Sequence, residues 1–285
     1  MDITGNCIDN IKDFLDWIEQ SRKTYVQTNG AQSVIFEHSH SYYRGQSCKD
    51  WPVVASVFRK EIWSITTEYD MLRMSMLRLW KEFKQYPSFL DKLVFLQHYG
   101  MKTRLLDVTC NPLIALFFAC IPSTTGEVCD GIVYCGHQHL YDNEKVAELT
   151  AEYVFTHSLR NIEEEIKTFS RERGVQLWEF AKPIFLSPPF NNERIENQKG
   201  AFIMLPLVRL KENSVTAFEG NIEGEHLFTE NVAIIPHSSK VKLLKDLCTL
   251  GIDRGTIFAD ISEKVKSIIQ EKQWEIEKYN TIKFE

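Results

Sequence analysis

One short segment constrains the fold of this chain more than any other, the run NPLIALFFAC at residues 111–120. Asn111 is a residue type that caps helices, and Pro112 suits the first helical position, so a helix is predicted to start here. Every later residue of the run is apolar, and a helix without a polar face is buried on all sides. The chain therefore has to enclose this helix in its core, which makes the helix a rigid platform for a site at its start.

Sequence patterns on both sides of this segment predict a mixture of helices and strands. Apolar residues recur at helical spacing over residues 8–20, 67–86 and 91–99, and β-branched and aromatic residues over 33–46 predict one or two strands. The strands predicted in the second half are residues 131–136, 183–188, 200–208 and 231–236, and the helices are residues 157–180, 239–250 and about 260–279. Because helices come mostly early and strands mostly late, the predicted class is α+β rather than a repeating βαβ array.

The start of the last predicted helix has a structural explanation. Asp260 stands three residues before Glu263, which is the spacing of a capping box. We therefore expect Asp260 to cap a helix and to take no part in chemistry.

Composition and charge narrow the class of protein. The chain has 285 residues, 44% of them hydrophobic and 25% charged, with no repeat or linker, which predicts a single domain over residues 1–285. A formal net charge of −6 argues against binding through blanket phosphate contacts, although a local basic site remains compatible with it. The longest apolar run, residues 112–122, is far shorter than the roughly 20 residues that cross a bilayer. Seven irregularly spaced cysteines and no N-terminal signal peptide predict reduced thiols and a cytoplasmic protein.

Standard catalytic and metal-binding motifs are absent from the sequence. It contains no Gly-rich dinucleotide loop, Walker sequence, HExxH or GxSxG. Cys129, Cys135, His137 and His139 are metal-ligand types, but their spacing matches no standard zinc site. Free thiols and loop histidines are the better interpretation, so no metal is expected.

The first of three polar groupings is YYRGQ, residues 42–46, at the end of a predicted strand. Arg44 follows two tyrosines and precedes Gly45, so its guanidinium could hold an anion while the glycine allows close backbone approach. The structural alternative is an arginine stacked on its tyrosines at a β-turn. These residues alone leave both interpretations open.

The second grouping precedes the buried helix and contains His98, Arg104, Asp107 and Thr109. The start of that helix carries unsatisfied N–H groups and the positive end of the helix dipole, which is a natural position for a phosphate. In the structural alternative, His98 completes the end of a helix and Arg104 pairs with Asp107. A third reading is a hydrolase in which His98 and Asp107 supply a base, although no carboxylate cluster is present for a metal.

The third grouping is ERIENQK, residues 193–199. It places Glu193, Arg194, Glu196 and Gln198 at the entry to a predicted buried strand. Taken alone, it is interpreted as a polar loop before a core strand.

Together the three groupings resemble the FRG domain family, which is named for a Phe-Arg-Gly motif that appears here as Tyr43-Arg44-Gly45. The likeness spans about residues 43–261, with 1–42 as an N-terminal helix and strand and 262–285 as a C-terminal helix. The further segments that carry it are DWPVVASVFRK with Trp51, Ser56, Phe58 and Arg59, QHYGMKTRLLDVTCNPLIALFFA, ERIENQKGAF and LGIDRGTIFADI.

The motif order of this family is similar to that of ADP-ribosyltransferases, which implies a mixed β core with a helical N-terminal part and C-terminal helices. The resemblance implies that Arg44 binds the phosphates of NAD and that Asp107-Val108-Thr109 takes the place of a Ser-Thr-Ser strand. It also aligns the helix containing Asn111, Ala115 and Phe118. The usual Glu-x-Glu reads Gln198-Lys199-Gly200 here, so either Glu196 or Gln198 takes the acidic role or catalysis is altered.

The resemblance thus implies a complete site. Its catalytic residues would be Arg44, Thr109, Glu196 and Gln198, and its contacts to NAD would be Tyr43, Arg44, Gly45, His98, Arg104 and Asp107. NAD is implied as a substrate without a metal, RNA or protein as the acceptor, and a toxin-like role in bacterial defence with an antitoxin as candidate partner. The alternative is a catalytically silent domain that senses a nucleotide or binds a partner.

Overall fold

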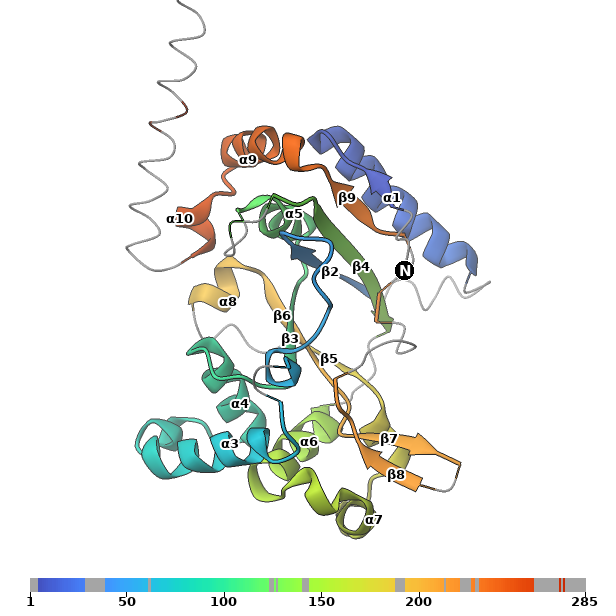
Figure 1. Ribbon diagram of the computed structural model, residues 1–285, viewed down its shortest axis with the longest axis vertical. Helices are drawn as coiled ribbons and strands as arrows, with labels where there is room; N and C mark the ends of the chain where they lie inside the picture. The colour runs from blue at the N-terminus through green and yellow to red at the C-terminus, as the bar shows by residue number, and fades with distance from the viewer. Residues whose placement is uncertain are drawn as a thin grey trace, which may run out of the picture.

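Seven strands form one mixed sheet, and two further strands form a separate hairpin (Figure 1). The computed structural model describes residues 5–28, 39–60, 63–122, 126, 128–139, 144–187, 193–212, 214–220, 227–228, 231–258, 272 and 274. The strands are β1 (Asn6–Cys7), β2 (Ser39–Gln46), β3 (Leu105–Thr109), β4 (Gly131–His139), β5 (Ile184–Leu186), β6 (Gly200–Met204), β7 (Val208–Lys211), β8 (Ser214–Ala217) and β9 (Ala233–Ile235). The large sheet has the order β1-β9-β4-β2-β3-β6-β5, and the hairpin is β7-β8.

The α-helices of the described residues surround this sheet. They are α1 (Ile11–Thr28), α3 (Thr67–Arg78), α4 (Phe89–His98), α5 (Pro112–Cys120), α6 (Glu144–Thr156), α7 (Ile162–Arg173), α8 (Glu193–Asn197), α9 (Lys240–Thr249) and α10 (Arg254–Ile257). Short 3-10 helices lie at η1 (Ser56–Phe58), η2 (Glu82–Gln85), η3 (Leu159–Asn161), η4 (Leu177–Ala181) and η5 (His237–Ser239). The predicted α+β class is confirmed.

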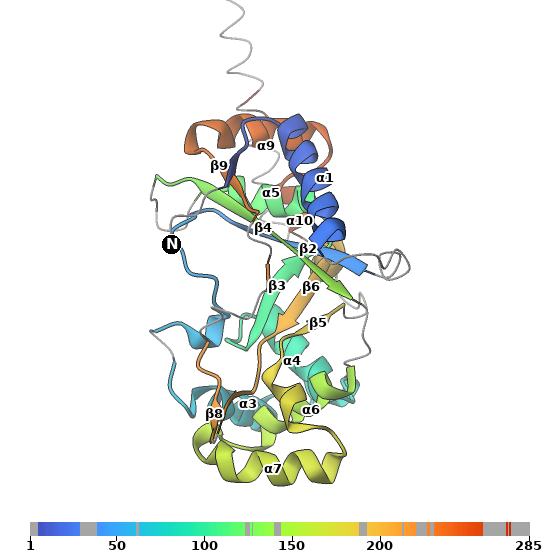
Figure 2. The same ribbon diagram turned by 90° about the vertical axis from the view of Figure 1, so that its right-hand side faces the viewer.

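The sheet opens between its two central strands. β2 pairs with β4 from Ser39 to Gln46, and β3 pairs with β6 along its whole length, but β2 and β3 share only the pair Tyr43 and Thr109. The two halves of the sheet therefore meet at a single point and diverge beyond it (Figure 2). We call this divergence of β2 from β3 the fork.

Helix α5 is the buried helix that the sequence predicts. Asn111 Oδ1 accepts a hydrogen bond from Leu113 N at 2.9 Å, and Pro112 occupies the first turn, as expected. The helix packs against β2 and β4 on one side and against α1 and α9 on the other (Figure 1). A Cβ on Gly45 would lie 1.9 Å from Ala115 O, and one on Gly131 would lie 2.2 Å from Ala119 O. The glycines are needed because the helix backbone lies directly on the strands.

A second core lies beyond the other half of the sheet. It brings together apolar side chains of α3, α4, α6 and α7 with β5 and β6. A third cluster, which includes Tyr42, Phe58, Leu106 and Phe218, lies on the face of β2 and β3 opposite to α5. Side chains of both β2 and β3 are therefore buried on the two faces of the sheet near the fork.

Several predicted boundaries differ from those observed. The helix predicted over 67–86 ends at Arg78, and η2 follows it. The helix predicted over 157–180 is divided into η3, α7 and η4. Helix α7 ends before η4 because Gly174 adopts the left-handed region (φ 63°). The strand predicted over 200–208 divides into β6 and β7. Helix α6, strand β8 and helix α10 had no counterpart in the prediction. Of the helix predicted at 260–279 the structure describes only residues 272 and 274, both of them helical, and the capping role of Asp260 lies outside the described residues.

The cysteines differ from the expectation that all thiols are free. A disulfide joins Cys48 to Cys129, with Cα atoms 5.4 Å apart, while Cys7, Cys110, Cys120, Cys135 and Cys248 are free. The bond links the segment after β2 to the segment before β4. This pairing corrects the interpretation of Cys129 as a free thiol.

None of the helices within the described ranges has the length and apolar character needed to span a membrane.

Candidate functional site

Arg44 lies on β2 at the fork. It directly follows Tyr43, whose pairing with Thr109 joins the two halves of the sheet. Its Nη1 donates a hydrogen bond to the backbone carbonyl of Asp107 at 2.6 Å, and its Nε donates to Gln46 Oε1 at 3.2 Å. The side chain therefore reaches across the opening from β2 to β3. It is held in place but remains partly exposed to solvent.

The charge of Arg44 is not matched by an ion pair among the described residues. Burial lowers the pKa of its guanidinium, the charge of Asp107 opposes this, and the positive charge of Arg59 lowers it further. Within the described part of the chain, neither Arg44 nor Arg59 forms an ion pair. A partly dehydrated cation beside another cation is costly unless an anion binds, so Arg44 has the character of an anion-binding residue.

An aromatic residue lies opposite Arg44 in the sheet. Tyr134 is the cross-strand partner of Arg44 on β4, so the two side chains point to the same face of the sheet. Its ring centroid is 5.2 Å from that of Phe228, and Phe228 also contacts Tyr42 at 5.8 Å. Tyr134 and Phe228 are both partly exposed. The sequence analysis missed Tyr134, because only the strand register places it opposite Arg44.

Gln198 lies where β6 begins, on the other side of the fork. Its backbone carbonyl accepts a hydrogen bond from Thr109 Oγ1 at 2.7 Å, which ties it to the residue paired with Tyr43. Its Nε2 is buried and has no hydrogen-bond partner among the described residues. A buried amide donor without an acceptor costs about 1–3 kcal/mol, so it is a candidate to bind a ligand oxygen.

The backbone next to Gln198 is strained. Lys199 adopts φ 43°, the left-handed region, and no other described non-glycine residue has positive φ. This conformation costs on the order of 1 kcal/mol or more for a residue with a Cβ, and such strain often occurs at functional sites. Glu196, the other candidate for the acidic role, is exposed on α8. The geometry therefore favours Gln198 over Glu196.

Thr109 has a structural task at the fork. Its buried hydroxyl donates to Gln198 O and accepts from Asn111 N at 3.0 Å, so both hydrogen-bonding functions are in use. It aligns β6 with the start of α5 and can act on a ligand only through Gln198.

The start of α5 offers no free donors for a phosphate. Pro112 has no N–H, Leu113 N donates to the Asn111 side chain, and Ile114 N and Ala115 N donate to Asn111 O. These first-turn groups are satisfied within the protein. The expected anion position at this helix start therefore lacks support, and Arg44 is the better-placed group.

Arg104 is fully buried and does not pair with Asp107. Its Nε lies 3.1 Å from both carboxylate oxygens of Glu68, and its Nη1 donates to Pro206 O at 2.7 Å. The expected pair with Asp107 is wrong, because Glu68 of α3 reaches the guanidinium instead. No solvent contact remains at Arg104, so its role here is structural.

The carboxylate of Asp107 and the ring of His98 contact residues of α4 and its end. Asp107 is the exposed residue of β3, and its two carboxylate oxygens accept from Gln97 Nε2 at 3.1 and 3.2 Å. His98 ends α4, where its ring packs edge-on against Tyr99 at 4.9 Å. Asp107 contributes its carbonyl to Arg44 and its charge to the field around that guanidinium.

Tyr43 and Gly45 support the sheet. The Tyr43 side chain is buried on the α5 face, opposite to Arg44, and burial raises the pKa of its hydroxyl to about 12. Gly45 makes room for α5. Neither residue is placed to contact a ligand that Arg44 holds on the other face.

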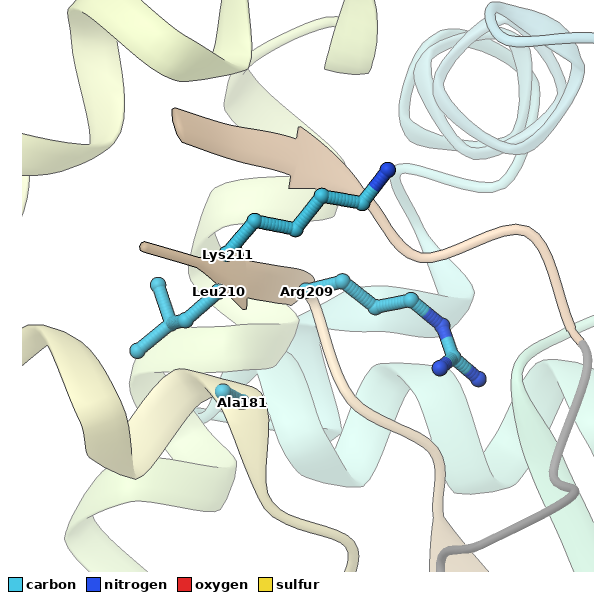
Figure 3. Close-up of a pocket in the computed structure, with 4 residues that line it drawn as sticks. All are labelled: Ala181, Arg209, Leu210 and Lys211. Atoms are coloured by element: carbon cyan, nitrogen blue, oxygen red, sulfur yellow. The ribbon is translucent and has the colours of Figure 1, made fainter. Parts of the chain in front are cut away.

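Two other kinds of site were considered among the described residues, a metal site and a hollow away from the fork. No three His, Cys, Asp or Glu side chains there are arranged to hold a metal ion. An open hollow of about 250 Å³ is lined by Ala181, Arg209, Leu210 and Lys211 on β7 and η4. Figure 3 shows Arg209 and Lys211 extending on the side of β7 opposite to Leu210. The lining of this hollow includes no acidic residue, and it belongs to η4 and the β7-β8 hairpin rather than to the fork.

The Tyr43-Arg44-Gly45 motif of β2 and the start of α5 both lie within a segment that matches one known family of domains. Residues 39–127 match the FRG domain. The chain carries an FRG domain. Comparison with curated proteins and with solved structures gives no significant match.

The FRG domain contains Arg44, Arg59, Arg104, Asp107 and the start of α5. Gln198, Glu196 and the segment 250–261 lie beyond the matched residues, so the likeness of those segments to the family remains a prediction. The large sheet nevertheless brings Gln198 of β6 against Thr109 of the FRG domain.

Proposed function

We propose that the protein binds NAD at the fork and transfers its ADP-ribose group to RNA or protein. The observation that carries the proposal is the state of Arg44, a partly exposed guanidinium that bridges β2 and β3 and forms no ion pair with a described residue. An arginine in that state suits a pyrophosphate, whose oxygens accept bidentate hydrogen bonds.

Gln198 takes the ribose side of the reaction in this proposal. Its unpartnered Nε2–H would donate to an oxygen of the ribose attached to nicotinamide, and Thr109 would hold Gln198 in place through its carbonyl. As the bond between nicotinamide and C1′ breaks, positive charge develops on that ribose, and the amide carbonyl dipole of Gln198 can stabilise it. An acceptor nucleophile then bonds to C1′ and loses a proton to solvent, and nicotinamide leaves with the bonding electron pair.

The amide of Gln198 cannot accept that proton at neutral pH. Glu196 is exposed on α8 and would become the base only if α8 moved towards the fork. The proposal therefore predicts slow transfer to acceptors that are already nucleophilic.

Incubation of the protein with NAD labelled in the adenylate part, together with total RNA or soluble protein, tests the proposal. Label is expected in one macromolecular fraction with wild type and in neither with Arg44→Ala. Arg73→Ala, which removes an exposed cation from α3, is the matched control and is expected to label normally. A wild-type protein that labels neither fraction refutes the transfer reaction.

A second function is a domain that binds the nucleotide without turnover. The observation that favours it is Gln198 at the position where the resemblance to ADP-ribosyltransferases would place a carboxylate. Thermal unfolding with and without NAD separates the two functions, because a sensor is stabilised by NAD while free nicotinamide does not accumulate.

We further propose that the protein acts in the cytoplasm as a toxin of bacterial defence and that an antitoxin is its partner. The support for this role is the match to the FRG domain. Induced expression is then expected to arrest bacterial growth, and Arg44→Ala to relieve the arrest at equal protein level. Growth that is unaffected by wild-type protein at high level contradicts the toxin role.

A further inference from the structure

Helix α3 carries large apolar side chains on its outer face as well as on the face that packs into the core. It lies at the edge of the molecule and packs against α6 (Figure 1). Leu72 is buried and Met76 packs against the same core, which defines the inner face of the helix. Met74 and Leu77, on the opposite side, are 43% and 66% exposed. Because a surface helix normally carries polar residues there, the fold accounts for only one of the two apolar faces.

Trp80 follows directly at the end of α3 and is 52% exposed. The Nζ atoms of Lys84 and Lys81 lie 4.6 and 5.7 Å from the centroid of its ring. The attraction between a cation and an aromatic ring becomes stronger when water is excluded, so a partner that covers Trp80 would strengthen both contacts. Three residues of chain span at most about 11 Å, so one partner segment can contact both Leu77 and Trp80.

The residues around this apolar face are basic, although the formal net charge of the chain is −6. Residues 77–85 contain three cations, Arg78, Lys81 and Lys84, and one carboxylate, Glu82. All three cations are exposed, and none of them forms an ion pair with another described residue. We call the exposed apolar residues and these cations the α3 surface: Met74, Leu77, Arg78, Trp80, Lys81 and Lys84.

The charges of the α3 surface favour one kind of occupant. A second copy of this chain at a symmetric interface would bring like charges together, whereas an acidic partner meets opposite charges around an apolar centre. Asp70 is exposed one turn before Met74, so a carboxylate also lies beside the apolar residues. That carboxylate disfavours a continuous polyanion, such as a nucleic acid or an anionic lipid surface. A protein segment can place its acidic residues beside the cations alone.

We propose that the α3 surface docks an acidic, amphipathic segment of another protein. The apolar side chains of that segment would cover Leu77 and Trp80, and its carboxylates would pair with the surrounding cations. None of the six residues of the α3 surface is assigned to NAD, so this inference stands without the proposed function.

Fluorescence anisotropy of a labelled peptide, titrated with the full chain, tests the proposal. The probe is a synthetic amphipathic peptide with leucines on one face and glutamates on either side of them, and in the comparison peptide each glutamate is replaced by lysine. Wild type is expected to bind the acidic peptide at least about tenfold more tightly than the lysine peptide, with an affinity that falls as the salt concentration rises. Equal binding of the two peptides, or no binding of the acidic one, overturns the proposal.

Variants of the surface test the two kinds of contact separately. Leu77→Ala and Trp80→Ala remove apolar contacts, and Lys84→Glu reverses a charge; each is expected to weaken binding of the acidic peptide by about tenfold or more. Leu250→Ala and Lys242→Glu change a similarly exposed leucine and lysine of α9 and its end, and are expected to bind as wild type does. An equal loss in the α9 variants would show unspecific attraction and overturn the proposal.

Thermal unfolding without peptide identifies any variant that fails to fold. If Trp80→Ala is such a variant, Leu77→Ala and Lys84→Glu carry the comparison, because their side chains are exposed.

Other occupants of the α3 surface would give different results. Phosphatidylglycerol vesicles or single-stranded oligouridine that bind more tightly than the acidic peptide, and lose affinity with Lys84→Glu, would replace the protein partner by a lipid surface or RNA. A dimer in sedimentation experiments that Leu77→Ala dissociates would assign the surface to a second copy of the chain. Either result refutes the proposal.

Discussion

Arg104 and Glu68 form a fully buried ion pair that joins β3 to α3. The two side chains are 0% and 2% exposed, and the carboxylate of Glu68 also accepts a hydrogen bond from Arg104 N at 3.2 Å. Arg104 further donates to the carbonyl of Pro206 after β6, so one guanidinium connects three parts of the fold.

Arg104→Ala is expected to destabilise the protein strongly. It leaves the Glu68 carboxylate buried and unpaired, which costs about 3–5 kcal/mol. Urea unfolding measures the loss. The double variant Arg104→Met with Glu68→Leu is expected to be more stable than either single variant, because no isolated charge remains. Two single losses that simply add would contradict this account.

Gly45→Ala is expected to destabilise the protein because its Cβ would overlap Ala115 O. Overpacking against backbone typically costs about 1–3 kcal/mol or more. The control Gly100→Ala meets no atom within 4 Å and carries only the cost of its left-handed φ of 86°, about 1–2 kcal/mol. Thermal unfolding of both variants provides the measurement. If Gly45→Ala folds with normal stability and loses only NAD binding, the glycine serves the ligand rather than α5.

Asp130→Asn tests an electrostatic contribution near the start of β4. Asp130 accepts from Lys49 Nζ at 2.8 Å and from His237 N at 3.0 Å, and these contacts hold its pKa below its ordinary value. A lowered pKa stabilises the fold fully above the unfolded-state value of about 4, and this stability is lost as the pH falls through the folded-state value.

The variant is therefore expected to be less stable than wild type at pH 7, by at most about 1 kcal/mol because the pair is partly exposed. The difference is expected to shrink as the pH falls below about 4, and to disappear once the pH is below the lowered pKa of Asp130 in the folded protein. Urea unfolding across that range gives the profile. Asp16→Asn, which breaks the exposed pair with Lys12, is the control and is expected to show little effect at any pH. A deficit that is unchanged in acid argues against this role of Asp130.

Thiol counting tests the bond between Cys48 and Cys129. Protein unfolded without reductant is expected to show five reactive thiols, and seven after reduction. Because the bond closes a loop across 81 residues of sequence separation, reduction is expected to lower the unfolding free energy by about 2–4 kcal/mol. Seven thiols before reduction, with an unchanged melting temperature, would show that the bond does not form.

Local patterns predicted α5 well because both of its signals are local. Asn111 and Pro112 mark the start, and an apolar residue at every later position requires burial. The partner of Arg104 could not be predicted in the same way. Glu68 lies 36 residues earlier, and only the tertiary fold brings the start of α3 to the residue that precedes β3.

The same limit applies to the candidate site. Arg44 stands out in the sequence as a charged residue at a strand end, but Tyr134 becomes its neighbour only through the register of β2 and β4. The missing acceptor for Gln198 Nε2 depends on the packing around β6. The start of α5 resembled an anion site because local sequence does not reveal that Asn111 satisfies its donors.

The central claim is that Arg44 holds the phosphates of NAD at the fork, and calorimetric titration of NAD into wild type and Arg44→Ala tests it most directly. Arg44 is partly exposed and forms no ion pair with a described residue, so the variant is expected to melt near the wild-type temperature. Losing bidentate phosphate contacts is expected to weaken NAD binding by roughly tenfold to a hundredfold. Equal affinity of the folded variant and wild type for NAD would contradict the account.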